Sequence, residues 1–129
     1  MTKAKSVTAA TIAYTVVLTT LCLVPISAPT PNLQVIGFDK LVHIGLYFGL
    51  NVLLISTIIA RRTKATATQI AATTMVAIAY GTIIEFVQQQ VGRDFDIYDI
   101  AANSLGAIIA AIIICLPQIN GRLAKYLSE

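Results

Sequence analysis

Four long apolar windows constrain the fold of this chain more than any other feature. They run from about residue 7 to 26, 38 to 60, 70 to 90 and 97 to 117. Each approaches the roughly 20 residues that an α-helix needs to cross the core of a bilayer. With 57% hydrophobic and only 12% charged residues, the chain is too apolar for a water-soluble domain. We therefore predict an all-α fold, a bundle of four transmembrane helices that forms one domain over residues 1–129.

The first window has a second interpretation, a cleaved signal peptide. Lys3 and Lys5 precede it, and small residues follow it at Ser27 and Ala28. Its apolar stretch of about 20 residues is longer than the usual core of a signal peptide. We therefore interpret the window as a retained transmembrane helix.

Basic residues are divided unequally between the two ends of the predicted bundle. Lysine and arginine near short loops are retained on the cytoplasmic side of a membrane. One end has Lys3, Lys5, Arg61, Arg62, Lys64, Arg122 and Lys125, and the other has Lys40 and Arg93. This distribution predicts that both termini are cytoplasmic. Because the basic residues are spread over tails and loops without interleaved aromatic residues, we predict no nucleic-acid partner.

Acidic residues show the opposite bias. The predicted outer end has Asp39, Glu85, Asp94, Asp96 and Asp99, and the inner end has Glu129. Acids that served only solubility would be expected at both ends. The bias indicates that the outer face needs carboxylates for its function.

Each of the last three predicted helices has a polar stripe at its outer end. At 100° per residue, the stripe of the second helix consists of Asp39, Lys40, His43 and Tyr47, with Asn51 deeper. The stripe of the third helix consists of Glu85, Gln88 and Gln89, and that of the fourth consists of Asp96, Asp99 and Asn103. Exposing a charge to lipid costs on the order of 2 to 3 kcal/mol near the bilayer centre. We therefore predict that the stripes face one another and form a shared polar pocket.

Helix capping offers a structural explanation for some of these acids. Asp96 stands where an N-cap is expected, Asp99 would complete an arrangement like a capping box, and Asp39 would cap the second helix. Asp99 and Asn103 extend beyond the first turn, so we assign them to the pocket. Glu85 lies about 7 Å below the helix end, and a carboxylate there needs a partner, for which Lys40, His43 and Arg93 are the candidates.

His43 is the single histidine of the chain. Asp39 lies one helical turn before it and would orient its ring, which makes His43 a candidate for general acid or base catalysis together with Glu85. No dense metal-binding motif such as HExxH occurs, so the sequence predicts neither a metal nor a cofactor. A divalent ion would nevertheless offset the acidic surplus of the outer face.

Small residues and cysteines indicate how the helices pack. Close packing is predicted at Gly45, Gly49, Ala102, Gly106 and Ala110. The two cysteines, Cys22 and Cys115, are predicted near opposite surfaces of the membrane and therefore as free thiols.

Two segments, "DKLVHIGLYFGL" (39–50) and "IEFVQQQVGRDFDIYDIAANSLG" (84–106), resemble the VanZ-like family of small bacterial membrane proteins. The resemblance covers roughly residues 38–107. It carries the family pattern onto Asp39, Lys40, His43, Tyr47, Glu85, Gln88, Arg93, Asp99, Asn103 and Gly106. The interval from glutamate to arginine is about one residue shorter than in the family, so Gln89 is an alternative to Gln88.

The resemblance implies a location in the bacterial cytoplasmic membrane, a role in the cell envelope and a link to resistance against the glycopeptide teicoplanin. In one interpretation, the extracytoplasmic pocket binds a lipid headgroup, a lipid-linked cell-wall precursor or the antibiotic. In the other, the protein is a small membrane enzyme acting on such a precursor, with His43 and Glu85 as acid and base and Lys40 and Arg93 holding its phosphate. No serine or cysteine lies beside a base at a recognisable spacing, which favours binding. The sequence does not decide whether the protein is an enzyme, nor its oligomeric state.

Overall fold

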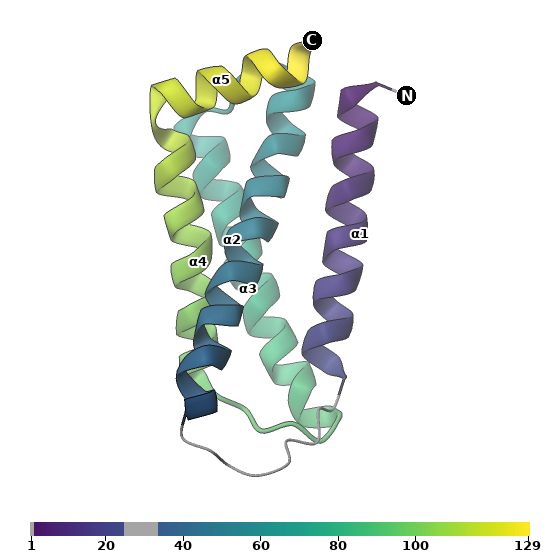
Figure 1. The fold of residues 1–129 in the computed structure, drawn as a ribbon, viewed down its shortest axis with the longest axis vertical. Coiled ribbons are helices and arrows are strands. Elements are labelled where there is room, and N and C mark those ends of the chain that lie inside the picture. The colour runs from purple at the N-terminus through teal and green to yellow at the C-terminus, as the bar shows by residue number, and fades with distance from the viewer. Residues whose placement is uncertain (1, 25–33) are drawn as a thin grey trace.

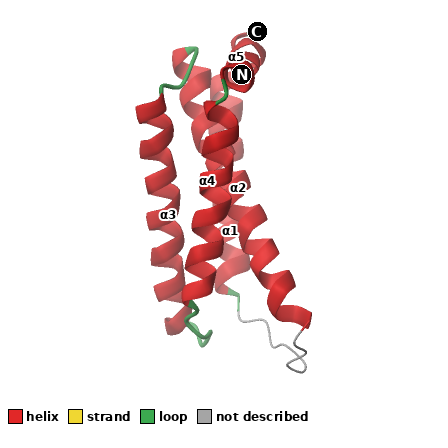
Figure 2. Cartoon of the chain, turned by 90° about the vertical axis from the view of Figure 1, so that its left-hand side faces the viewer, coloured by secondary structure: helices red, strands yellow, loops and turns green. Residues whose placement is uncertain are grey.

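The computed structural model describes residues 2–24 and 34–129, which form five helices and no strand (Figure 1). They are α1 (Lys3–Leu23), α2 (Gln34–Arg62), α3 (Ala67–Gln90), α4 (Ile97–Cys115) and α5 (Pro117–Ser128). The first four lie side by side and alternate in direction, and the second view shows the same bundle (Figure 2). All four are long and apolar enough to cross a membrane. The predicted all-α bundle with four membrane-spanning helices is confirmed.

Both termini lie at one end of the bundle, which we call the terminal end. At the opposite end, the loop end, α2 begins and a short connection joins α3 to α4 (Figure 1). The first loop of the bundle and the signal-peptide cleavage region at Ser27 and Ala28 lie outside the described residues.

The sequence did not predict α5. The fourth helix ends at Cys115, Leu116 is extended, and Pro117 begins α5 at a position that suits proline. Figure 1 shows α5 lying across the terminal end of the bundle. Its Leu127 is buried in a cluster that includes Ile59 of α2. A helix of 12 residues with an amphipathic pattern gives no long apolar window, so hydropathy alone missed it.

The beginning of α2 corrects one predicted cap. The helix starts at Gln34, five residues before Asp39, so Asp39 lies within the helix and cannot be its N-cap. This frees the Asp39 carboxylate for contacts with side chains. The other predicted boundaries differ from the observed ones by a few residues, as is usual for helix ends.

Close packing between α2 and α4 depends on Gly106. A Cβ atom there would lie 2.9 Å from the Ile44 carbonyl carbon and 3.0 Å from the Phe48 backbone nitrogen. Gly49 leaves space for Tyr14 of α1, whose hydroxyl donates to the Leu46 carbonyl at 2.8 Å. These contacts hold α1 and α4 against α2.

The prediction of a packing role for Gly45 is wrong. Gly45 is exposed, and no atom of the described neighbours lies within 4 Å of a Cβ built on it. The two predicted alanines of α4, Ala102 and Ala110, are buried. Both cysteines are free, as predicted, with Cys22 buried and Cys115 exposed.

Candidate functional site

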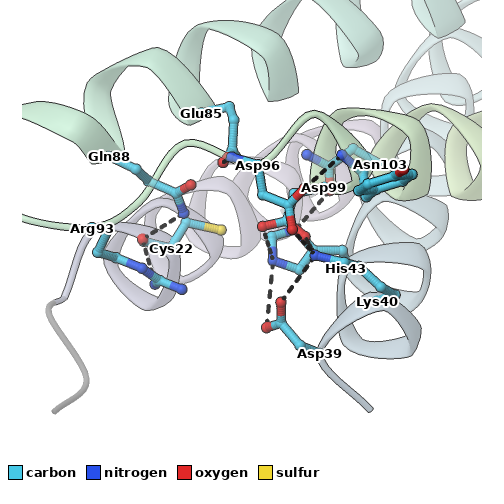
Figure 3. A network of polar contacts seen from close by, with 11 residues as sticks. Cys22, Asp39, Lys40, His43, Glu85, Gln88, Arg93, Asp96, Asp99 and Asn103 are labelled. Atoms are coloured by element: carbon cyan, nitrogen blue, oxygen red, sulfur yellow. Dashed lines mark hydrogen bonds and ion pairs between the residues drawn. The ribbon is translucent and has the colours of Figure 1, made fainter. Parts of the chain in front are cut away.

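Lys40 of α2 is surrounded by carboxylates at the loop end (Figure 3). Its ammonium group donates to Asp96 Oδ2 at 2.6 Å and to Asp99 Oδ1, and it lies 3.6 Å from Asp39 Oδ2. We call these four residues the Lys40 cluster. Its contacts join α2 to the beginning of α4, so the predicted facing of these two polar stripes is confirmed.

His43 lies one turn below Asp39 and is 5% exposed. Its Nδ1 atom is 2.9 Å from Asn103 Oδ1, and because an amide oxygen only accepts, Nδ1 carries the proton of this hydrogen bond. Its Nε2 atom lies 3.7 Å from Asp39 Oδ1 and 3.7 Å from Asp99 Oδ2. In the neutral ring the unprotonated nitrogen therefore faces two carboxylates.

Glu85 is 1% exposed, and its partner is a backbone group. Its Oε1 atom accepts the Asp96 N–H at 2.9 Å, whereas Oε2 has no hydrogen-bond partner in the described part of the chain. The predicted partners were wrong, because none of Lys40, His43 and Arg93 forms an ion pair with Glu85 within residues 2–24 and 34–129. Sequence periodicity could not reveal a backbone donor.

The N-terminus of α4 confirms one predicted cap and corrects another. Asp96 is the N-cap, and its side chain accepts the Tyr98 N–H at 2.8 Å. Asp99 does not complete a capping box, because Glu85 occupies the Asp96 N–H and the Asp99 carboxylate turns to Lys40. The Lys40 ammonium and the Tyr98 N–H lower the pKa of Asp96 from its usual value.

Gln88 and Arg93 bind the end of α1 instead of the Lys40 cluster. Gln88 Nε2 donates to the Cys22 carbonyl at 2.8 Å, and Arg93 Nη1 donates to the same oxygen at 2.7 Å. Figure 3 shows this group beside the Lys40 cluster. A carbonyl at a helix C-terminus has no partner within its own helix, so the two side chains satisfy it. Gln88 is buried and Gln89 is exposed, so of the two glutamines Gln88 faces the interior.

Tyr47 and Asn51 extend the polar stripe of α2 into the bundle. Tyr47 is fully buried, and Gly81 of α3 accommodates its ring, because a Cβ at Gly81 would lie 2.8 Å from Tyr47 Cε1. The Tyr47 hydroxyl has no hydrogen-bond partner among the described residues. Asn51 donates to Thr74 Oγ1 at 3.0 Å and to the Ala107 carbonyl at 2.8 Å. No sequence pattern pointed to Gly81 or Thr74, because only the helix packing brings them to the stripe.

The chemistry of the site follows from its charges. Three carboxylates of the Lys40 cluster share one ammonium group, and Arg93 is engaged elsewhere. No serine, threonine or cysteine hydrogen-bonds to His43 in the part of the chain that the structure describes. Asp39, His43 and Asp99 each offer a metal-ligand atom, and these atoms lie within 4.8 Å of one another. The arrangement suits the binding of positive charge better than covalent catalysis.

The fold and the site define an integral membrane protein with four spanning helices and a cluster of ionisable residues at one end. The family model described as VanZ/LLP1 matches residues 5–118. The chain belongs to the VanZ/LLP1 family, which confirms the resemblance seen in the sequence. No curated protein and no solved structure matches the chain.

Proposed function

We propose that this protein binds the polar headgroup of a membrane-embedded ligand, a lipid or a lipid-linked cell-wall precursor, at the loop end. The observation that carries the proposal is the Lys40 cluster together with His43, on two helices of membrane-spanning length. Ionisable side chains within membrane-spanning segments are costly and mark functional sites. The end of the bundle is also the depth at which lipid headgroups lie.

The charge balance of the site defines the ligand further. Lys40 is already neutralised by its carboxylate partners, and a surplus of carboxylates is left. A ligand that binds here must therefore bring positive charge, either as an amine or as a cation that accompanies a phosphate. Lipid headgroups and cell-wall precursors offer both kinds of group.

The distribution of basic residues supports an extracytoplasmic position for the loop end. Seven lysines and arginines belong to the terminal end, which the positive-inside rule assigns to the cytoplasm of a bacterial cell. Membership of the VanZ/LLP1 family supports a role in the cell envelope. The link of the family's namesake to teicoplanin resistance supports cell-wall precursors and glycopeptides as ligands to test first.

An enzymatic function on a lipid-linked precursor is the second candidate. It is favoured by the orientation of His43, since the Asn103 contact at Nδ1 directs Nε2 toward Asp39 and Asp99. A histidine held in this way is suited to accept or donate a proton. Glu85, the second acid or base of this hypothesis, would act with one oxygen already bound to the Asp96 N–H.

Native mass spectrometry of the protein in lipid nanodiscs tests the proposal. We expect a bound lipid or precursor in the wild type and at least a tenfold loss of it in Asp99→Asn, which reduces the surplus of carboxylates, and in His43→Gln. Lys64→Gln is the matched control, because Lys64 is exposed and lies between α2 and α3 at the terminal end. Equal retention in all variants would contradict the proposal, and conversion of the bound molecule by the wild type would favour the enzyme.

Labelling with a membrane-impermeant maleimide tests the orientation. In a background without Cys22 and Cys115, we expect Asp94→Cys to react in intact cells and Lys64→Cys to react only after permeabilisation. Both positions are exposed and lie at opposite ends of the bundle. The reverse result would place the site on the cytoplasmic face.

A further inference from the structure

Of the two cations near the site, Lys40 is neutralised by carboxylates and Arg93 lies at the end of α1, outside the Lys40 cluster. Lys40 donates to Asp96 and Asp99, and Arg93 donates to the Cys22 carbonyl. A phosphate that entered this region would meet the carboxylates of the Lys40 cluster and be repelled. Recognition of a phosphate here therefore requires another source of positive charge.

Three side chains beside Lys40 converge as ligands of a metal ion would. Asp39 Oδ1 and Asp99 Oδ2 each lie 3.7 Å from His43 Nε2, and all three residues offer ligand atoms within 4.8 Å of one another. An ion about 2.0 to 2.2 Å from each ligand holds them on the order of 3 to 4 Å apart. Small side-chain rotations would close the site, because the Asp39 side chain is 39% exposed and has solvent on one side.

His43 adds a buried nitrogen atom to the two carboxylates. The ring is buried, its Nδ1 proton is donated to Asn103, and Nε2 has no hydrogen-bond partner among the described residues. Nε2 lies 3.7 Å from an oxygen of each of two carboxylates, so one nitrogen and two oxygens converge on the same small space. Proteins usually orient a metal-binding histidine by a hydrogen bond from its second ring nitrogen to a carboxylate, a backbone carbonyl or water, and the Asn103 amide oxygen takes that place here.

A neighbouring carboxylate adds to the negative charge. Glu85 is almost fully buried, and its Oε2 atom has no partner in the described part of the chain. Figure 3 shows its side chain beside Asp96, on the side of the site opposite Asp39. With Oε1 it holds the Asp96 backbone, which fixes the segment that presents Asp99. The site thus has an anchored ligand on α4 and two ligands on α2.

We propose that Asp39, His43 and Asp99 bind a divalent metal ion, with Asn103 orienting the histidine. One imidazole nitrogen and two carboxylate oxygens suit zinc or manganese better than magnesium or calcium, which prefer oxygen ligands alone. The ion would neutralise the formal charge of the Lys40 cluster. Three protein ligands leave at least one coordination position open, as in metal sites that bind a substrate.

The open coordination position would allow the ion to bind a ligand at the membrane surface. A phosphate oxygen of a lipid or lipid-linked precursor would complete its coordination, so the ion would supply the positive charge that Lys40, already paired with carboxylates, cannot provide. This role in ligand recognition rests on the proposed function. Binding of the ion does not, and it can be measured without any lipid.

Isothermal titration with zinc and with manganese, on chelator-treated protein in detergent, tests the proposal. We expect one ion per chain in the wild type and at least tenfold weaker binding in Asp39→Asn, Asp99→Asn and His43→Gln. Asp94→Asn is the matched control, because Asp94 is an exposed acid near the same helix end. Asp39→Asn is the most informative variant, since the Asp39 side chain is 39% exposed and its replacement disturbs the buried packing least.

Cobalt substitution provides a second measurement, and its result for the wild type does not depend on the folding of any variant. We expect visible absorption bands of a cobalt ion with nitrogen and oxygen ligands in the wild type and their loss in His43→Gln. The proposal would be overturned if Asp94→Asn weakened metal binding as much as Asp39→Asn does. It would also be overturned if the wild type showed no cobalt spectrum. Ion binding without lipid binding would contradict only the proposed function, and lipid binding that persists in EDTA would contradict only the role of the ion.

Discussion

The Glu85 carboxylate accepts the backbone N–H of Asp96 at 2.9 Å and thereby connects the end of α3 to the beginning of α4. The contact closes the short turn between these helices and satisfies a donor that the N-cap leaves free. Asp96 and Asp99 are held where both reach the Lys40 ammonium. A buried carboxylate thus positions the acids of the candidate site.

Removal of the Glu85 acceptor should destabilise the protein. We expect Glu85→Ala to lower the free energy of unfolding by about 1 to 3 kcal/mol, because the Asp96 N–H loses its partner. Glu85→Gln keeps a carbonyl oxygen and should cost less than about 1 kcal/mol. Unfolding in detergent followed by circular dichroism measures both, with the exposed Glu129→Ala as control. Equal losses in the two Glu85 variants would contradict the hydrogen bond.

Lys40 and Asp99 should be coupled in a double-mutant cycle. Lys40→Met leaves the Asp99 carboxylate, 8% exposed, without its ion-pair partner, and should cost about 3 kcal/mol. Adding Asp99→Asn removes the uncompensated charge, so the double variant should regain about 1 to 2 kcal/mol. Unfolding of the four proteins under one condition gives the coupling energy. Additive effects would show that the two side chains do not interact.

Two glycines of the same bundle should respond oppositely to alanine. Gly106→Ala puts a methyl group against the α2 backbone at Ile44 and Phe48 and should cost about 1 to 3 kcal/mol. Gly45→Ala meets no described neighbour within 4 Å and should be neutral or stabilising by up to about 1 kcal/mol, because alanine favours the helix. Thermal unfolding in the same detergent compares them. A larger loss at Gly45 would contradict the α2–α4 contact.

The ion pair of Asp96 with Lys40 should make stability depend on pH. Lys40 lowers the pKa of Asp96 below the ordinary aspartate value of about 3.9, so the pair contributes fully above that value. Its contribution is lost as the pH falls through the lowered pKa. Asp96→Asn retains an N-cap and should cost under about 1 kcal/mol at neutral pH, because the aspartate is 37% exposed.

We therefore expect the stability difference between the wild type and Asp96→Asn to be constant from pH 6 to 8 and to narrow below about pH 4. Denaturant unfolding at a series of pH values measures the difference. Asp94→Asn, at an exposed acid two residues away, is the control and should show no such narrowing. A difference that widens toward acid would mean that Asp96 is not stabilised by Lys40.

Much of the candidate site followed from helical periodicity. Asp39, His43 and Tyr47 share one face of α2 because residues three or four apart lie on the same side of a helix. Their burial toward α4 followed from the cost of exposing charge to lipid. The preference of aspartate for the N-cap position predicted the role of Asp96, which the structure confirms.

The contact partner of each side chain could not be predicted from the sequence. The periodicity of one helix does not show how the neighbouring helices are rotated about their axes. Glu85, Gln88 and Arg93 bind backbone groups, and backbone donors and acceptors are the same at almost every residue of a sequence. Packing at Gly106 sets the approach of α2 and α4. A Cβ at Gly45, an equally small residue, would meet no described neighbour within 4 Å.

The sequence by itself therefore determined which helices span the membrane and which face of each is polar, because hydropathy and the 3.6-residue period are properties of single segments. Only the tertiary structure decided that Asp39, His43 and Asp99 converge while Arg93 is drawn to the end of α1. That choice depends on the distances between helices, which close packing at a few small residues sets.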